Sequence, residues 1–195
     1  MYFLKQKEIF INLIIYSILW GVTSNNYYLL TYYMRYLPGN VYDNSFASSG
    51  SEILASVVAG VSYNFLKANN NFRMAFTIAI LGSLLVVFFG NLSTKLMPVF
   101  VIIAKFGISI AYFTVYVATA DSFPTLFCAT AFGVCNFTGN IITIPAAYIS
   151  ELNQPWPMLV YASASALGLL LTFFIKDANY VSNPTVQTEE DDKIE

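Results

Sequence analysis

Six long apolar stretches, separated by short polar breaks, constrain this chain more than any other feature of its sequence. They cover residues 9–33, 46–66, 74–90, 97–120, 126–149 and 156–175. Each is about 17–25 residues long, the length that an α-helix needs to cross the hydrocarbon core of a bilayer. We therefore predict an all-α integral membrane bundle of six transmembrane helices, in which short connections make sequence neighbours antiparallel.

The composition supports a membrane protein and excludes several kinds of enzyme. Only 10% of the 195 residues are charged, whereas a soluble domain averages about 25%. The chain contains no histidine, which excludes zinc sites built on imidazole and the Ser-His-Asp and Cys-His catalytic groups. Its two cysteines, Cys128 and Cys135, are spaced for neither a redox pair nor a zinc site. We expect no enzyme, no cofactor and no metal.

The domain organisation predicted from the sequence is simple. Residues 1–178 form the six-helix transmembrane bundle, and residues 179–195 form a disordered, acidic cytoplasmic tail. The chain lacks a glycine-rich phosphate loop and a basic aromatic strip, so we expect no nucleic-acid partner. The lipid bilayer is the first partner that the sequence implies.

The distribution of lysine and arginine predicts the orientation of the bundle. With six spans, both termini lie on the same side of the membrane. That side collects Lys5, Lys7, Lys67, Arg73 and Lys176, and the opposite side holds only Arg35 and Lys95. Positive loops are retained in the cytoplasm, so both termini are predicted to be cytoplasmic.

Two charged residues fall inside predicted spans. Glu52 and Lys105 each lie about seven residues in from the outer end of their span, and so about 10 Å deep in the bilayer. A charge in hydrocarbon is costly unless it is paired, so we predict an intramembrane ion pair. In the alternative, Glu52 marks the outer start of a shorter span and Lys105 extends its ammonium to the headgroups.

Four of the predicted helices carry a polar or aromatic stripe at helical spacing. The stripes favour the wall of a polar cavity, although small and polar residues also serve helix packing in membranes. They consist of Gly21, Asn25, Tyr28 and Tyr32; of Glu52, Ser56, Ala59 and Tyr63; of Lys105, Ser109, Tyr112 and Tyr116; and of Gly133, Asn136, Asn140 and Thr143.

The region from Lys105 to Thr125 resembles a known family of transporters. It contains Lys105-Phe106, Tyr112, Tyr116 and the run Thr119-Ala120-Asp121-Ser122-Phe123-Pro124-Thr125. This pattern is similar to the tenth helix of the major facilitator superfamily, in the organic cation and organic anion transporter branch of the solute carriers. That helix starts with Gly-Lys-Phe and ends in Tyr-Thr-Ala-Glu-Leu-Phe-Pro-Thr.

Other positions extend the resemblance to residues 8–177. Trp20 and Tyr27-Tyr28 resemble the Trp and Tyr-Tyr of the seventh helix. Glu52 and Asn64 stand where the eighth helix has a glutamate and its loop motif an aspartate, and Lys67 and Arg73 loosely resemble the basic cluster of that motif. Gly133 fits the glycine of the eleventh helix. Asn140 stands about where cation transporters carry an aspartate and anion transporters an arginine.

The resemblance implies that the chain is the C-terminal six-helix half of a major-facilitator fold. Transport of a small organic solute by alternating access, in the plasma membrane, would then require a second bundle: upstream sequence, or a second chain. The alternative is a non-transporting half-transporter or truncated membrane protein that acts as a partner or regulatory subunit. The residues predicted to line the substrate cavity are Asn25, Tyr28, Glu52, Lys105, Tyr112, Tyr116 and Asn140. Those predicted to act in gating at the cytoplasmic loop are Asn64, Lys67, Arg73 and Asp121.

Overall fold

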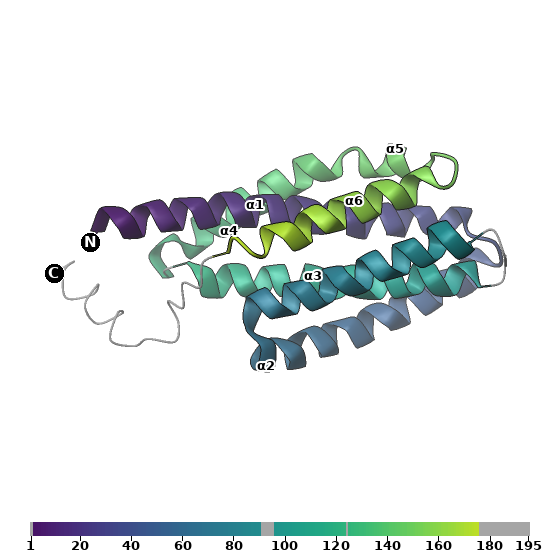
Figure 1. Cartoon of the computed structure of the whole chain (residues 1–195), viewed down its shortest axis with the longest axis horizontal. Coiled ribbons are helices and arrows are strands. Elements are labelled where there is room, and N and C mark those ends of the chain that lie inside the picture. The colour runs from purple at the N-terminus through teal and green to yellow at the C-terminus, as the bar shows by residue number, and fades with distance from the viewer. Residues whose placement is uncertain (1, 91–95, 124, 176–195) are drawn as a thin grey trace.

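The computed structural model of the chain describes residues 2–90, 96–123 and 125–175, and this part is helical with short connections. Its elements are α1 (Tyr2–Tyr33), the 3-10 helix η1 (Met34–Tyr36), α2 (Val41–Phe89), α3 (Met97–Ser122), α4 (Thr125–Thr143), α5 (Ala146–Ser150) and α6 (Trp156–Leu171). The long helices lie roughly along one direction in an elongated bundle (Figure 1). The predicted all-α class is confirmed. The acidic tail predicted at residues 179–195 lies outside the described residues.

Helix α2 folds back on itself, and this corrects the predicted ends of the second and third spans. The backbone leaves the helical region at Lys67 (φ 57°, ψ 174°), and Figure 1 shows the two arms of α2 turning back there. The first arm begins at Val41 rather than at residue 46. The second arm includes Asn71, which the sequence assigned to a polar break, because this side chain is buried and bonded to the first arm and to α3.

The predicted fifth span is interrupted near its end. Helix α4 ends at Thr143, and the short α5 follows from Ala146 to Ser150. Pro145 lies at the junction. Proline has no backbone N–H and its ring clashes with the preceding turn, so it ends a regular helix. The prediction of a single helix over residues 126–149 is therefore wrong, and α6 ends at Leu171 rather than at residue 175.

Three helical segments within the described residues are long and apolar enough to cross a membrane. They are Ile9–Tyr36, Val41–Phe89 and Met97–Ser122. A straight helix of 49 residues, the length of α2, would be about 74 Å long, more than twice the thickness of the hydrocarbon core. Folding back at Lys67 divides it into two arms of membrane-spanning length. Six crossings remain a prediction, since α4 is not among these three segments and α6 is a shorter apolar helix.

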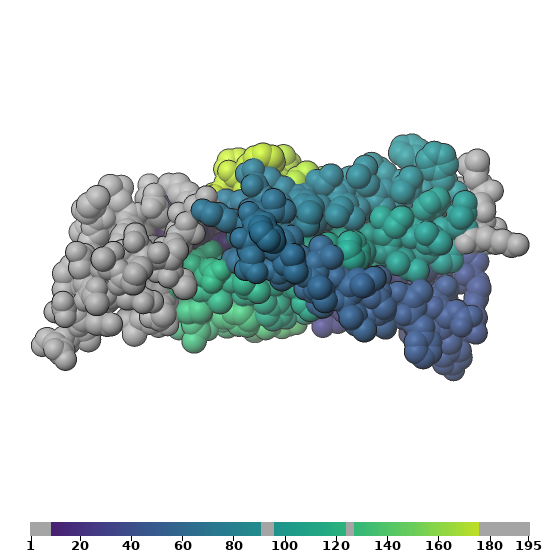
Figure 2. All heavy atoms as spheres, turned by 90° about the horizontal axis from the view of Figure 1, so that it is seen from below, coloured from purple at the N-terminus to yellow at the C-terminus, as the bar shows by residue number. Residues whose placement is uncertain are grey.

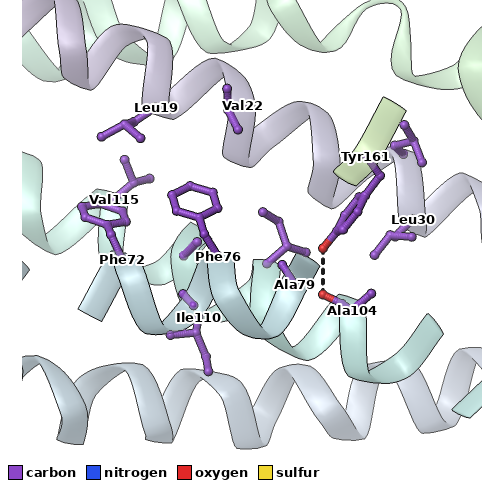
Figure 3. Close-up of a cluster of buried hydrophobic side chains, with 14 of the residues drawn as sticks. Leu19, Val22, Leu30, Phe72, Phe76, Ala79, Ala104, Ile110, Val115 and Tyr161 are labelled. Atoms are coloured by element: carbon purple, nitrogen blue, oxygen red, sulfur yellow. Dashed lines mark hydrogen bonds between the residues drawn. The ribbon is translucent and has the colours of Figure 1, made fainter. Parts of the chain in front are cut away.

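The core lies between α1, the second arm of α2, α3 and α6. Figure 3 shows Leu19, Phe76 and Ile110 in this region, each contributed by a different helix. Phe76 and Ile110 are fully buried. Tyr161 of α6 is also fully buried, and its hydroxyl donates a 2.8 Å hydrogen bond to the Ala104 carbonyl of α3. This bond satisfies a polar group that burial would otherwise leave without a partner.

Two glycines allow the second arm of α2 and α3 to approach closely. A Cβ atom placed on Gly82 would lie 2.4 Å from the backbone nitrogen of Ala104. One placed on Gly107 would lie 2.5 Å from the backbone nitrogen of Ala79. Each glycine thus faces the backbone of the other helix, an arrangement typical of small residues in membrane helix packing.

The first arm of α2 presents a long apolar face to the surroundings. Figure 2 shows one side of the molecule, on which α2 lies beside parts of α3 and α4. The exposed side chains of this arm include Ile53, Leu54, Val57, Val61 and Phe65. An apolar face of this extent is costly in water and is typical of a protein that contacts lipid or another apolar helix.

Candidate functional site

Glu52 and Lys105 form the ion pair that the sequence predicted. Lys105 Nζ lies 3.2 Å from Glu52 Oε1, which joins the first arm of α2 to α3. The lysine side chain is 0% exposed and the glutamate side chain 28% exposed. The lysine therefore does not extend to the headgroups, as the alternative required, and the two charges compensate each other within the bundle.

Tyr27 of α1 completes the surroundings of this pair. Lys105 Nζ donates to the Tyr27 backbone carbonyl at 3.1 Å and to Thr31 Oγ1 at 2.5 Å. The same nitrogen lies 3.5 Å from the centroid of the Tyr27 ring, within the range of a cation–π contact. The Tyr27 hydroxyl donates to Glu52 Oε2 at 2.9 Å. An ammonium has three N–H donors, so Lys105 has one acceptor for each, and both oxygens of Glu52 are engaged.

A column of aromatic rings extends from this pair between α1 and α3. The Tyr27 and Tyr112 rings stack with their centroids 4.6 Å apart. The hydroxyls of Tyr112 and Tyr116 are 3.0 Å apart, and the Tyr116 ring lies 4.5 Å from that of Trp20. The Trp20 Nε1 donates to Thr119 Oγ1 at 2.9 Å. The predicted cavity residues Tyr112 and Tyr116 are therefore linked to the ion pair through the Tyr27 ring.

A pocket of about 350 Å³ lies between the end of α1 and the α4–α5 junction. Its lining residues are Tyr28, Tyr32, Asn140, Thr143, Ile144 and Ala147. The Asn140 Nδ2 donates to Asn136 Oδ1 at 2.6 Å, and the Thr143 hydroxyl donates to the Gly139 carbonyl at 2.8 Å. Tyr28 connects the pocket to the ion pair, since its ring lies 5.5 Å from the Tyr27 ring.

Asn25 is placed differently from the other predicted cavity residues. It is buried and is not among the residues that line the pocket. Its Nδ2 donates to Asn26 Oδ1 at 3.5 Å, and its own Oδ1 has no hydrogen-bond partner among the described residues. Asn25 lies one helical turn before Tyr28 on the same stripe of α1.

The predicted gating residues lie around the turn of α2 and the end of α3. The Tyr63 hydroxyl donates to Asp121 Oδ2 at 2.7 Å, which ties the first arm of α2 to the end of α3. Asn64 and Lys67 are exposed at the turn. The Arg73 guanidinium lies 4.3 Å from the centroid of the Phe173 ring, beyond the end of α6. Asp121 is thus the predicted gating residue through which α3 is joined to the first arm of α2.

The sequence stripes missed two residues that hold helices together, Tyr27 at the ion pair and Asn71 between the arms of α2 and α3. Tyr27 contacts both members of the ion pair, but the stripe on α1 runs through Tyr28 instead. In the sequence, Tyr27 was indicated only by the Tyr27-Tyr28 pair, which carries part of the family resemblance. Asn71 donates to Thr114 Oγ1 at 2.9 Å and accepts from Ser62, although its place in an asparagine-rich segment predicted a loop.

Together, the long apolar helices and the polar cluster between them define a helical membrane protein with a charged, aromatic interior site. Within the described residues, no group of three His, Cys, Asp or Glu side chains is arranged to hold a metal ion. No protein-family model matches the chain.

The chain is a distant homologue of the solute carrier family 22 organic cation and carnitine transporters, a branch of the major facilitator superfamily. It is 30% identical over 176 residues to solute carrier family 22 member 21 of Mus musculus, a match that covers 86% of this chain and 30% of the relative. It is 28% identical over 171 residues to organic cation/carnitine transporter 2 of Homo sapiens, covering 82% of this chain and 29% of that protein.

A relative from an insect matches this chain with similar identity and coverage. The organic cation transporter-like protein of Drosophila melanogaster is 26% identical over 175 residues, which cover 88% of this chain and 30% of the relative. The chain thus spans about a third of the length of the relatives it matches. These relatives are named as transporters, not as enzymes.

Proposed function

We propose that this chain forms the C-terminal six-helix bundle of a transporter for a small organic solute, which works by alternating access. The observation that carries the proposal is the polar cluster of Glu52, Lys105 and Tyr27 at the meeting of α1, α2 and α3. Intramembrane charges are expensive and mark function by default. The homology to solute carrier family 22 supports transport as that function.

In this proposal, the cavity wall is the side where α1, the first arm of α2, α3 and α4 carry their partly exposed polar residues. Glu52, Tyr28, Tyr112 and Tyr116 are all partly exposed there, and Asn140 is exposed. A second bundle would cover this side and complete the cavity. The end of the bundle that contains the turn of α2, with Lys67 and Arg73, is the more basic end, and basic loops are retained in the cytoplasm. Both termini would lie at this end and would therefore be cytoplasmic.

In this mechanism, the ion pair makes the cavity wall polar. It leaves no unpaired charge there, because the carboxylate and the ammonium compensate each other. A buried pair is weak evidence for stability, since desolvation offsets much of the attraction. Its retention inside a membrane bundle is better explained by function. Tyr63 and Asp121, at the cytoplasmic end, would form a contact that opens or closes as the bundles rock.

Uptake measurements test this proposal. Cells express the full chain alone, or with the N-terminal bundle of organic cation/carnitine transporter 2, and take up radiolabelled carnitine, tetraethylammonium or an uncharged aromatic amide. We expect saturable uptake of at least one solute in the combined arm, reduced by Glu52→Gln and by Lys105→Met. Asp43→Asn is the matched control, because Asp43 is an exposed acid in the first turn of α2.

Two results would contradict the proposal. One is the absence of uptake above that of untransfected cells in both arms, with the chain correctly inserted. The other is uptake that Glu52→Gln, Lys105→Met and Asp43→Asn leave equally unchanged. If the chain instead altered uptake by a complete transporter without transporting anything itself, the regulatory alternative would replace transport.

A further inference from the structure

Asn71 joins three helical segments through one carboxamide. Its side chain is fully buried on the second arm of α2. Its Oδ1 accepts from the Ser62 hydroxyl at 2.6 Å. Its Nδ2 donates to the Ala59 carbonyl of the first arm at 3.3 Å and to Thr114 Oγ1 of α3 at 2.9 Å, and the two N–H groups of a carboxamide match these two acceptors. Asn71 therefore holds the first arm of α2 against α3.

The packing face of the first arm does not by itself determine where this arm lies along α3. Its large apolar side chains, such as Phe46 and Phe65, are exposed. Its buried residues are small or polar and recur at helical spacing: Asn44, Ser48, Ser51, Ala55 and Ala59. A face without large side chains has no knob that must enter one particular hole. After a shift of one turn, small residues would again face the same surface, so polar contacts distinguish one position from the next.

Two polar links define the same position of the first arm along α3. One is the ion pair of Glu52 and Lys105, and the other is the bridge from Ala59 through Asn71 to Thr114. Glu52 and Ala59 are about 10.5 Å apart along their helix, and Lys105 and Thr114 are about 13.5 Å apart along theirs. These spacings differ by less than one turn, so both links form in one alignment. A shift of one turn, about 5.4 Å, would break both.

Neither of the other features at this end of α2 replaces the bridge. The contact of Tyr63 with Asp121 opens and closes in the proposed mechanism, so it cannot hold the alignment throughout. Lys67 has φ 57° and ψ 174°, a conformation that residues other than glycine rarely adopt and that persists only where surrounding contacts hold it. Asn71 lies one turn after Lys67, and its bond to Ala59 helps to close this turn.

We propose that Asn71 is a positioning residue that sets the axial register of the first arm of α2 against α3, and thereby holds Glu52 opposite Lys105. The inference rests on the proposed function, which assigns this ion pair to the cavity wall. Asn71 acts through the helix that carries Glu52, since its bonds go to Ala59 of that helix and to α3. A single buried asparagine fixes the register of coiled coils in the same way, at a cost in stability.

Spin labels measure this register directly. Phe46→Cys on the first arm and Val117→Cys on α3 replace exposed side chains in an otherwise cysteine-free full chain, which is labelled and placed in lipid nanodiscs. With the two helices aligned by the ion pair, the labelled positions are about 27 Å apart along the helix axes. Double electron–electron resonance gives the distance distribution. We expect Asn71→Ala to shift its mean by about 5 Å, one helical turn, or to add a second population at that shift.

Three variants show whether the bridge is responsible. Asn70→Ala is the matched control, because this asparagine is exposed and its bond with Arg73 stays within the second arm; it should leave the distance unchanged. Thr114→Val removes the hydroxyl and should shift the distance as Asn71→Ala does. Thr114→Ser keeps the hydroxyl and should keep the parental distance. If Asn71→Ala lost its helical circular dichroism, the two substitutions at Thr114 would decide the question.

A second measurement connects the register to the ion pair. Glu52→Gln shifts the midpoint of unfolding in sodium dodecyl sulfate because it breaks the pair. In the Asn71→Ala background the pair is already separated, so Glu52→Gln should shift the midpoint by no more than about half as much. A residue that only stabilised the bundle would leave this shift undiminished.

The outcomes separate this inference from the proposed function. Parental distances in both Asn71→Ala and Thr114→Val would overturn the inference, as would a broadened distribution with the parental mean. So would a shift in Asn70→Ala, a shift in Thr114→Ser as large as in Thr114→Val, or an undiminished effect of Glu52→Gln. All of these results leave solute transport standing. A one-turn shift in Asn71→Ala without uptake in any arm would overturn transport and keep the register.

Discussion

Breaking the Glu52–Lys105 pair from either side should have unequal consequences, because the two partners are buried to different degrees. Glu52→Gln leaves a lysine that is 0% exposed without its counter-ion. Lys105→Met leaves a carboxylate that is 28% exposed and still accepts from the Tyr27 hydroxyl. We predict that Glu52→Gln destabilises the bundle more than Lys105→Met does.

The magnitudes follow from the contacts. Removing one partner of a buried ion pair costs about 3–5 kcal/mol when the remaining charge has no access to water. We assign this range to Glu52→Gln, since Lys105 would lose its counter-ion and keep only neutral partners, namely the Tyr27 carbonyl and ring, Thr31 and the new amide oxygen. Partial hydration of Glu52 lowers the cost of Lys105→Met to about 1–3 kcal/mol. The double variant removes both charges and should cost less than Glu52→Gln alone.

A double-mutant cycle in detergent measures these differences. The chain in mild micelles is unfolded with sodium dodecyl sulfate, and Trp20 and Trp156 fluorescence reports the midpoint. We expect a coupling energy of at least about 2 kcal/mol between positions 52 and 105. Neutral replacement is preferable to exchanging the charges, because a glutamate at position 105 would face the Tyr27 carbonyl oxygen. Additive single effects, or a larger cost for Lys105→Met, would refute the reasoning.

Three further predictions concern packing and topology. Gly107→Ala should destabilise the bundle by about 1–3 kcal/mol because its Cβ would meet the facing backbone; Gly60→Ala, where nothing lies within 4 Å, is the control and should be neutral or stabilising in the same unfolding assay. Asn71→Ala should cost about 2–3 kcal/mol, since it removes three hydrogen bonds that join the second arm of α2 to the first arm and to α3; an unchanged midpoint would contradict this. A single cysteine at Asn64, in a cysteine-free background, should react with an impermeant maleimide only from the cytoplasmic side, and labelling from outside would reverse the proposed topology.

The sequence determined the class of structure because the constraint is local. A run of about 20 apolar residues has one stable form in a bilayer, a helix with its own backbone bonds satisfied. The core helices α1 and α3 were therefore predictable from residues 9–33 and 97–120. The pairing of Glu52 with Lys105 was also predictable, since an isolated charge at that depth requires a partner.

The boundary between the second and third spans was decided by tertiary contacts. Asn71 reads as a loop residue by composition, but the structure buries it because Ser62, Ala59 and Thr114 satisfy its amide. Such partners come from elements distant in sequence, and no local pattern contains them. The interruption at Pro145 had a local signal, the missing backbone donor of proline.

The residues of the site were also predicted in part by the sequence and decided in part by packing. Helical periodicity assigned Tyr28, Tyr112 and Tyr116 to one wall, yet Tyr27 is the residue that contacts both charges. Helical periodicity indicates which residues share a face only to within about one position along the helix. The rotation of α1 against α2 and α3, which packing determines, decides whether Tyr27 or Tyr28 faces the ion pair. The sequence alone determined that charges and tyrosines would lie inside a helical membrane bundle. Only the tertiary structure decided which tyrosine holds the pair and that no free charge is left beside the pocket, because hydrogen-bond partners are set by packing.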